Sequence, residues 1–94
     1  MDLKQSFTES LEALVQSLEA NHPEARTTRF VRESLAEVKE AEGVALTGQI
    51  QQFLEKAPIV KSSEKLDFSV EEKELWHKVL DHKQLGNNLW GLSL

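Results

Sequence analysis

The sequence predicts an all-α fold, an antiparallel four-helix bundle with an apolar C-terminal tail. Apolar residues recur at intervals of three and four through four stretches of the chain, and glycines or prolines separate most of these stretches. No stretch shows the strict alternation of a half-buried β-strand. Short connections between such helices favour antiparallel neighbours. The 94 residues are expected to form one domain, residues 1–94, because this length leaves no room for a second core.

The first helix is expected over residues 3–20. Its apolar positions fall within an arc of about 120°, and glutamate and glutamine side chains lie opposite. These positions are Leu3, Phe7, Leu11, Leu14, Val15 and Leu18. Asp2 can cap the first turn, because its carboxylate accepts hydrogen bonds from free backbone N–H groups. The pattern ends before Pro23.

The second helix is expected over residues 24–42. Pro23 suits its first turn, with Asn21 or His22 near the cap. Gly43 is expected to end it, since glycine adopts the left-handed conformation without a Cβ clash. The predicted buried face consists of Phe30, Val31, Leu35, Val38 and Ala41, with Thr27 and Ser34 between them.

The third helix is expected over residues 45–57. Its predicted inward positions are Leu46, Ile50, Phe53, Leu54 and Ala57. Pro58 is expected to end or kink this helix, because the proline ring clashes with the carbonyl of Leu54. Residues 59–68 lack one clean period, and we interpret them as a connector anchored by Leu66 and Phe68.

The fourth helix is expected over residues 70–85, and a capping box indicates where it starts. The Ser69 hydroxyl accepts from the Glu72 amide, and the Glu72 carboxylate reaches back to Ser69. Leu75, Trp76, Val79 and Leu80 are predicted to share its buried face. Gly86 is the expected stop. The tail, residues 86–94, is apolar for a terminus and either folds back onto the third and fourth helices or contacts a partner.

Composition and charge indicate a folded cytoplasmic protein. Hydrophobic residues make up 39% of the chain, which is enough for a core, and there is no cysteine for disulfides or metal thiolates. The N-terminus does not look like a secretory signal, and no segment approaches the about 18 consecutive apolar residues of a membrane span. The net charge of −5 repels phosphate backbones, which argues against nucleic acid as a partner.

Several segments partly match motifs for phosphate or metal binding, but each lacks residues that the motif requires. The segment from Gly43 has a glutamine, Gln49, where a phosphate-binding loop needs lysine. Glu74 and His77 have the spacing of a di-iron ligand pair, but such sites need two pairs, and with Asp81 they form a solvated polar triangle. His82 lies about 140° around the helix from His77, too far to share an ion. We therefore predict no enzyme activity, no cofactor, no metal and no small-molecule substrate.

Two alternatives to a single binding protein remain open. In the first, the second and third helices form a helix-turn-helix reader of nucleic acid around Gly43, with Thr47, Gln49, Gln51 and Gln52 free to contact bases. In this alternative the third helix would enter the groove of the nucleic acid, and Lys56 is its only basic residue, although positive charge supplies most of the affinity for nucleic acid. The arginine stripe of the second helix, Arg26, Arg29 and Arg32, shares its face with glutamates, and Arg29 can pair with Glu33. The second alternative is a subunit of a larger helical assembly.

The C-terminal half resembles a known family. The resemblance lies in Leu46, Ile50, Phe53 and Leu54, in the run from Lys65 to Ser69, in Glu72, Leu75 and Leu80, and in the trailing run from Asn88 to Leu92. In these spacings the chain is similar to immunity proteins against pediocin-like bacteriocins, the enterocin A immunity family, although many members are basic and this chain is acidic.

The resemblance implies a small cytosolic antiparallel four-helix bundle. Such proteins protect a bacterium from its own pore-forming peptide by engaging the mannose phosphotransferase permease after the peptide has bound it. It also implies that specificity lies in the fourth helix and the C-terminal segment. We accordingly predict partner recognition by Trp76, Lys83, Leu89, Trp90 and Leu92, either from the cytosol or at the inner face of the membrane.

Overall fold

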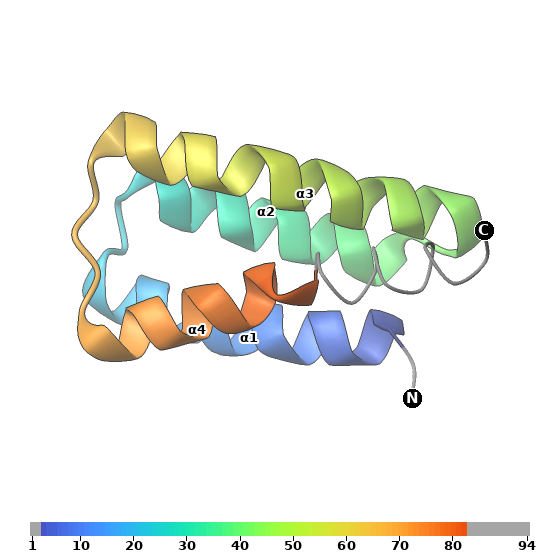
Figure 1. The fold of residues 1–94 in the computed structure, drawn as a ribbon, viewed down its shortest axis with the longest axis horizontal. Helices are drawn as coiled ribbons and strands as arrows, with labels where there is room; N and C mark the ends of the chain where they lie inside the picture. The colour runs from blue at the N-terminus through green and yellow to red at the C-terminus, as the bar shows by residue number, and fades with distance from the viewer. Residues whose placement is uncertain (1–2, 83–94) are drawn as a thin grey trace.

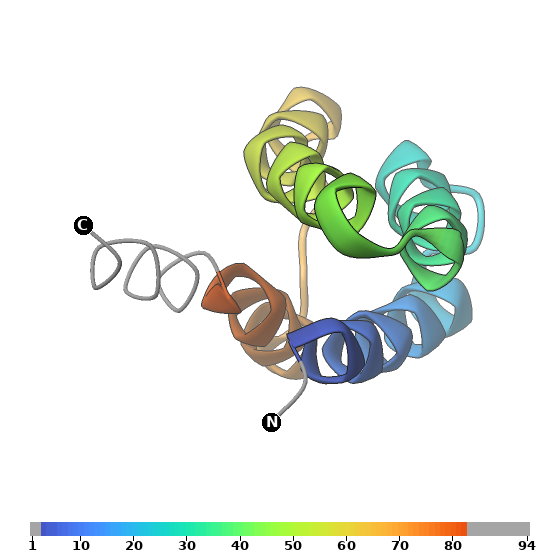
Figure 2. The same ribbon diagram turned by 90° about the vertical axis from the view of Figure 1, so that its right-hand side faces the viewer.

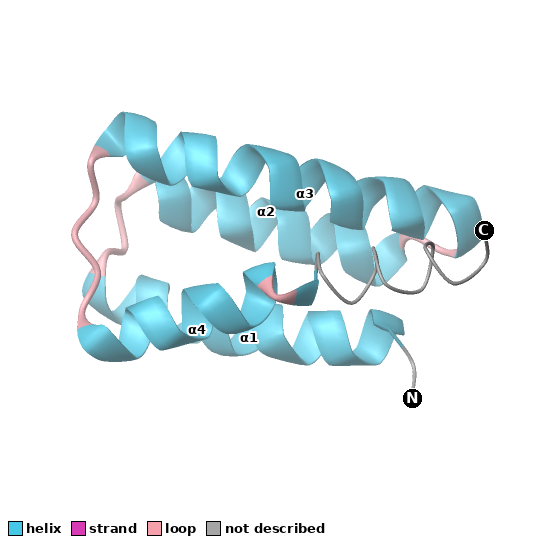
Figure 3. Ribbon diagram, in the orientation of Figure 1, coloured by secondary structure: helices cyan, strands magenta, loops and turns pink. Residues whose placement is uncertain are grey.

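The computed structural model describes residues 3–82, and every regular element in that range is an α-helix (Figures 1 and 3). The helices are α1 (Leu3–Asn21), α2 (Arg26–Glu40), α3 (Gly43–Glu64) and α4 (Val70–Leu80). The predicted all-helical class is therefore confirmed. Across the same range, no helix combines the length and the apolar character that crossing a bilayer requires. Gly86 and the predicted tail, residues 86–94, lie outside the described residues.

The four helices lie along the long axis of the molecule and follow an arc when viewed end-on (Figure 2). α1 packs against both α2 and α4, and α2 packs in turn against α3. α3 and α4 form the two ends of the arc and are not among the closely packed pairs. The α1–α2 turn and the α3–α4 connector lie at the same end, on the left of Figure 1.

The inward faces of the four helices join in one apolar cluster. Its buried members are Phe7, Leu11, Leu14, Val15, Leu18, Val31, Val38, Ile50, Phe53, Leu54, Ala57, Phe68, Trp76 and Val79. All of them are positions that the helical spacing or the connector predicts to lie inward. Phe30, Leu35, Leu46, Leu66, Leu75 and Leu80 are partly buried around it. Because a fully buried leucine or phenylalanine contributes about 1.5–3 kcal/mol, this cluster is the main source of stability.

The start of α2 differs from the expectation. α2 begins at Arg26, and its N-cap, Ala25, offers no side-chain cap. The cap comes instead from Glu64 at the far end of α3. One oxygen of this carboxylate accepts from the Arg26 amide at 2.8 Å, and the other accepts from the amide and hydroxyl of Thr27, both at 2.8 Å. A carboxylate at a helix N-terminus satisfies free N–H groups and complements the helix dipole.

The predicted role of Gly43 is partly wrong. α2 ends at Glu40 with Ala41 in an extended conformation, and Gly43 is the first residue of α3. Gly43 nonetheless has the expected left-handed backbone, with φ of +58°. A side chain at this position would be strained, because L residues rarely adopt such a φ. The glycine therefore sets the direction in which the chain enters α3.

The predicted end of the third helix at residue 57 is also wrong. α3 continues through Pro58 to Glu64, and the helix closes at Lys65, whose φ is 57°. Proline inside a helix removes one hydrogen bond and costs about 3 kcal/mol. Pro58 lies on the exposed side while Ala57 is fully buried, so the packing of α3 and the hydrogen bonds of Glu64 offset that cost. The connector therefore shrinks to residues 65–69.

The start of α4 is confirmed. The Ser69 hydroxyl accepts from the Glu72 amide at 3.2 Å, and the Glu72 carboxylate accepts from the Ser69 amide at 2.7 Å. The described part of α4 runs to Leu80, and the predicted end at residue 85 lies outside the described residues.

Candidate functional site

The predicted recognition residues fall into two groups. Trp76 lies on α4 with only 6% of its surface exposed, and its ring meets Phe68 edge-on at 5.3 Å between centroids. Trp76 therefore packs the connector against α4, and its recognition role stays a prediction. The other four, Lys83, Leu89, Trp90 and Leu92, lie outside the described residues.

α4 presents a charged outer face to solvent. A surface hollow of about 550 Å³ on this helix is lined by Glu71, Glu74, Leu75, His77, Lys78 and Asp81. Glu74, His77 and Asp81 are all exposed, as the predicted solvated triangle requires. Within residues 3–82 no three histidine, cysteine, aspartate or glutamate side chains are grouped to hold a metal ion.

His82 has a different environment from His77, because it is buried against α1. Its Nδ1 lies 3.1 Å from the carbonyl of Lys78 and 3.0 Å from that of Val79. Carbonyls only accept, so Nδ1 carries the proton and donates. Nε2 lies 3.1 Å from the Ser6 hydroxyl, which can then donate to it. His82 thus holds the end of α4 against the start of α1.

A buried polar cluster joins the α1–α2 turn to the start of α4. His22 Nε2 lies 2.9 Å from Glu72 Oε2, and the Glu72 side chain is only 2% exposed. The two atoms are in contact but lack hydrogen-bond geometry, and the contact is an ion pair only when the imidazole carries a proton on both nitrogens. Thr28 donates to the His22 carbonyl at 2.6 Å and holds the turn in place.

The two carboxylates at this end of the molecule have lowered pKa values. Burial raises the pKa of Glu72, but the hydrogen bonds from Ser69 and the nearby His22 outweigh it and bring the pKa below the ordinary 4.5. Burial likewise raises the pKa of Glu64, and its hydrogen bonds from Thr27 and Arg26 lower it further than burial raises it. Both carboxylates are therefore held in the ionised form.

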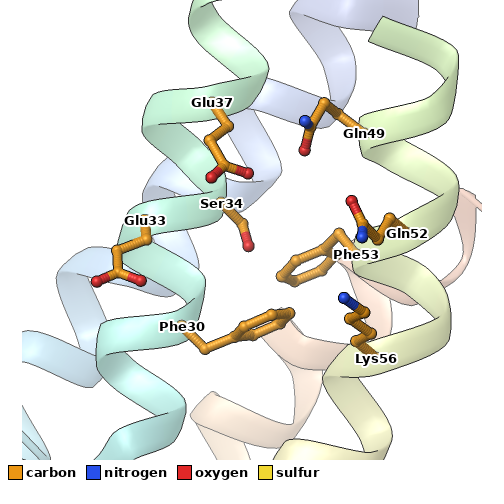
Figure 4. Close-up of a pocket in the computed structure, with 8 residues that line it drawn as sticks. All are labelled: Phe30, Glu33, Ser34, Glu37, Gln49, Gln52, Phe53 and Lys56. Carbon is orange, nitrogen blue, oxygen red and sulfur yellow. The ribbon is translucent and has the colours of Figure 1, made fainter. Parts of the chain in front are cut away.

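A groove between α2 and α3 is the second candidate site (Figure 4). It encloses about 280 Å³. Its floor is a stacked pair, Phe30 from α2 and Phe53 from α3, with ring centroids 5.5 Å apart and planes 9° from parallel. We call this site the α2–α3 groove, and the side chains above its floor are Glu33, Ser34 and Glu37 from α2 and Gln49, Gln52 and Lys56 from α3.

The polar side chains of the α2–α3 groove make no hydrogen bond or ion pair with any described residue. Ser34 is nine-tenths buried, and its hydroxyl points into the space between the two helices (Figure 4). The ion pair that the spacing of Arg29 and Glu33 allows is not formed among the described residues, whereas Arg32 pairs with Glu19 of α1 at 3.1 Å. Two carboxylates and one ammonium group leave the groove with a net charge of −1.

Sequence reasoning missed this groove because its residues belong to two helices. Gln49 and Gln52 were candidates for reading bases, yet both line the groove facing α2. The hydroxyl of Thr47, another candidate, donates to the carbonyl of Gly43 at 3.4 Å. The available signal was the pair Glu33 and Glu37, one turn apart on the same face as Phe30.

Neither family models, nor curated proteins, nor solved structures give a match to this chain.

Proposed function

We propose that this chain is a bacteriocin immunity protein that protects its producer by binding the bacteriocin–permease complex from the cytosolic side. In this proposal the four helices form an antiparallel bundle that serves as a scaffold. α4 and the C-terminal segment recognise the mannose phosphotransferase permease with its bound peptide. The protein acts by binding alone, in the cytoplasm or against the inner face of the membrane.

The observation that carries the proposal is the placement of α4. Among the described helices it packs closely against α1, and the side chains of Glu71, Glu74, His77, Lys78 and Asp81 are exposed. On the buried side of α4, Trp76 packs against Phe68, and His82 just after the helix contacts Ser6 of α1. A surface held in one conformation loses little entropy when a partner binds, which favours recognition.

The chemistry of this face suits a polar partner surface. Glu71, Glu74 and Asp81 alternate with Lys73, Lys78 and His77 on exposed positions. Mixed charges of this kind contribute more to specificity and to the association rate than to affinity. Apolar side chains in the C-terminal segment would then supply most of the binding energy, because tryptophan is enriched among binding hot spots.

Expression in a bacteriocin-sensitive strain tests the proposal directly. We expect survival against at least one pediocin-like peptide in a panel, and loss of that survival when Lys78→Glu reverses a charge on the open face of α4. Arg29→Glu is the matched control, because it makes the same charge change on an exposed position of α2. Unchanged survival against every peptide of the panel would refute the assignment. Equal protection by the two variants would remove the role of α4.

Substitutions in the C-terminal segment separate recognition from packing. We expect Leu89→Ala, Trp90→Ala and Leu92→Ala to reduce protection while the helical circular dichroism is retained. Trp76→Ala should instead lower the stability, because the residue is buried against Phe68. Full protection by the three C-terminal variants would place the recognition surface elsewhere.

A further inference from the structure

The floor of the α2–α3 groove offers an aromatic face to a ligand. Phe53 is 2% exposed and belongs to the core, whereas Phe30 is only partly buried and forms the accessible part of the stack. Methylene groups pack well on such a ring, and a guanidinium plane is attracted to its face. The floor therefore favours a side chain that is both apolar along its length and cationic at its end.

The α2 wall supplies negative charge that no described residue compensates by an ion pair. Glu33 and Glu37 are one helical turn apart, both are exposed, and neither forms an ion pair with a described residue. Like charges at this spacing repel each other. Ser34 lies between them, nine-tenths buried, with its unpartnered hydroxyl directed into the groove (Figure 4). A cation placed here would relieve the repulsion and give the hydroxyl a partner.

The α3 wall supplies groups suited to a polypeptide. The side-chain amides of Gln49 and Gln52 each carry a donor and an acceptor, which match the backbone N–H and carbonyl of a peptide. Lys56 lines the same groove and repels a second cation. It therefore directs the cationic end of a ligand toward α2.

We propose that the α2–α3 groove binds one arginine side chain of a partner polypeptide. The guanidinium lies between Glu33 and Glu37, its methylenes rest on Phe30, and the two glutamines contact the partner backbone. The planar fork of arginine matches paired carboxylates better than the point charge of lysine. A volume of about 280 Å³ accommodates one such side chain. The site goes beyond the function proposed above and is independent of it, because it lies on helices other than α4.

Nuclear magnetic resonance titration of the full ¹⁵N-labelled chain tests this proposal. The probe is Nα-acetyl-arginine amide, and the control is Nα-acetyl-citrulline amide, which has the same shape without the charge. We expect the arginine probe to shift the side-chain amide signals of Gln49 and Gln52, and the citrulline probe to leave them unchanged. The shifts should shrink as the ionic strength rises, because the two carboxylates are exposed.

Two matched double variants locate the binding. Glu33→Gln with Glu37→Gln should abolish the shifts, whereas Glu24→Gln with Glu40→Gln should retain them. Both pairs remove two exposed carboxylates, so the net charge changes equally. Lys56→Gln should strengthen the association by about twofold, because it removes one exposed like charge. Retained circular dichroism in each variant ensures that loss of binding is not loss of fold.

Several results would overturn the proposal. No shift at any probe concentration, equal shifts with citrulline, or equal loss in the two double variants would each do so. Preferential binding of free arginine over the capped amide would assign the groove to a small metabolite instead of a polypeptide. None of these results bears on the protection assay, so the two proposals fail separately.

Discussion

The contact between α1 and α2 and the contact between α2 and α3 share one helix but use polar residues in opposite ways. Two ion pairs join α1 to α2, Arg32 with Glu19 at 3.1 Å and Lys39 with Glu12 at 3.8 Å. A third joins Lys4 of α1 to Glu42, just after α2, at 2.9 Å. Along the α2–α3 groove, two glutamates, two glutamines, a serine and a lysine surround an aromatic stack without pairing to any described residue.

The difference shows which surface of α2 is used for stability and which is available for binding. Exposed ion pairs contribute little individually, about 0–1 kcal/mol, but each of these pairs neutralises the charge of both its members. In residues 3–82, the charged and hydrogen-bonding side chains of the α2–α3 groove have no such partner. At one end of the two helices, the Glu64 carboxylate of α3 accepts hydrogen bonds from the first amides of α2. These bonds fix the position of α3 relative to α2.

The largest expected loss of stability follows from removing Phe53, which packs in both helix contacts. Phe53 meets Phe7 of α1 edge-on at 5.8 Å and stacks on Phe30 of α2. We expect Phe53→Ala to lower the free energy of unfolding by about 3–5 kcal/mol in urea denaturation. Phe30→Ala, at a partly buried position, should cost less. A larger loss for Phe30→Ala would contradict this account of the floor.

The next largest loss of stability is expected when the cap that Glu64 of α3 supplies to α2 is removed. Glu64→Ala leaves the amides of Arg26 and Thr27 without their partner, and should cost about 0.5–2 kcal/mol. Faster hydrogen exchange at these two amides would confirm the cause. Glu24→Ala, at an exposed position just before α2, is the control and should change the stability by a few tenths at most. Equal losses in the two variants would rule out the cap.

Acid should weaken the same end of the molecule. The pKa values of Glu64 and Glu72 are lowered below 4.5 in the folded chain. The unfolded chain therefore binds protons more readily, so this stability is complete well above about pH 4.5 and is lost as the pH falls below it. Urea denaturation at a series of pH values measures the loss. Glu64→Gln with Glu72→Gln should flatten the dependence, and an unchanged slope would contradict the assignment.

The smallest change in stability is expected for a glutamate-to-glutamine substitution, made once in the α1–α2 contact and once in the α2–α3 groove. Glu19→Gln removes the ion pair with Arg32 and should cost under about 1 kcal/mol. Glu37→Gln removes a like-charge repulsion with Glu33 and should raise the stability by about 0.2–0.5 kcal/mol. Opposite signs in thermal denaturation sharpen the comparison. A net loss for Glu37→Gln would show that Glu37 has a stabilising partner.

Local patterns predicted those parts of the fold that depend on near neighbours. The start of α4 followed from Ser69 and Glu72, which are three residues apart and cap each other. The end of α3 did not follow, because the cost of Pro58 is offset by packing that the local sequence does not display. The start of α2 depends on Glu64, which lies 38 residues from Arg26 along the chain.

The candidate sites were less predictable than the helices. The spacing of Arg29 and Glu33 allows an ion pair on α2, yet the described residues form none there. Arg32 pairs with Glu19 of α1, and Glu33 lines the rim of the α2–α3 groove. Gln49 and Gln52 acquire their role only when α3 lies against α2. Trp76 was correctly placed on the apolar face of α4, but the recognition assigned to it depends on residues 83–94.

Intermolecular nuclear Overhauser effects test most directly whether the α2–α3 groove is the surface left open for a partner. The full chain would be saturated with Nα-acetyl-arginine amide, and contacts from the arginine methylene protons would be recorded. We predict contacts to the ring protons of Phe30 and to the side-chain amide of Gln52, and none to the side chains of Glu12 or Glu19. Contacts along the α1–α2 side, or no contact to Phe30 under saturating probe, would contradict the account.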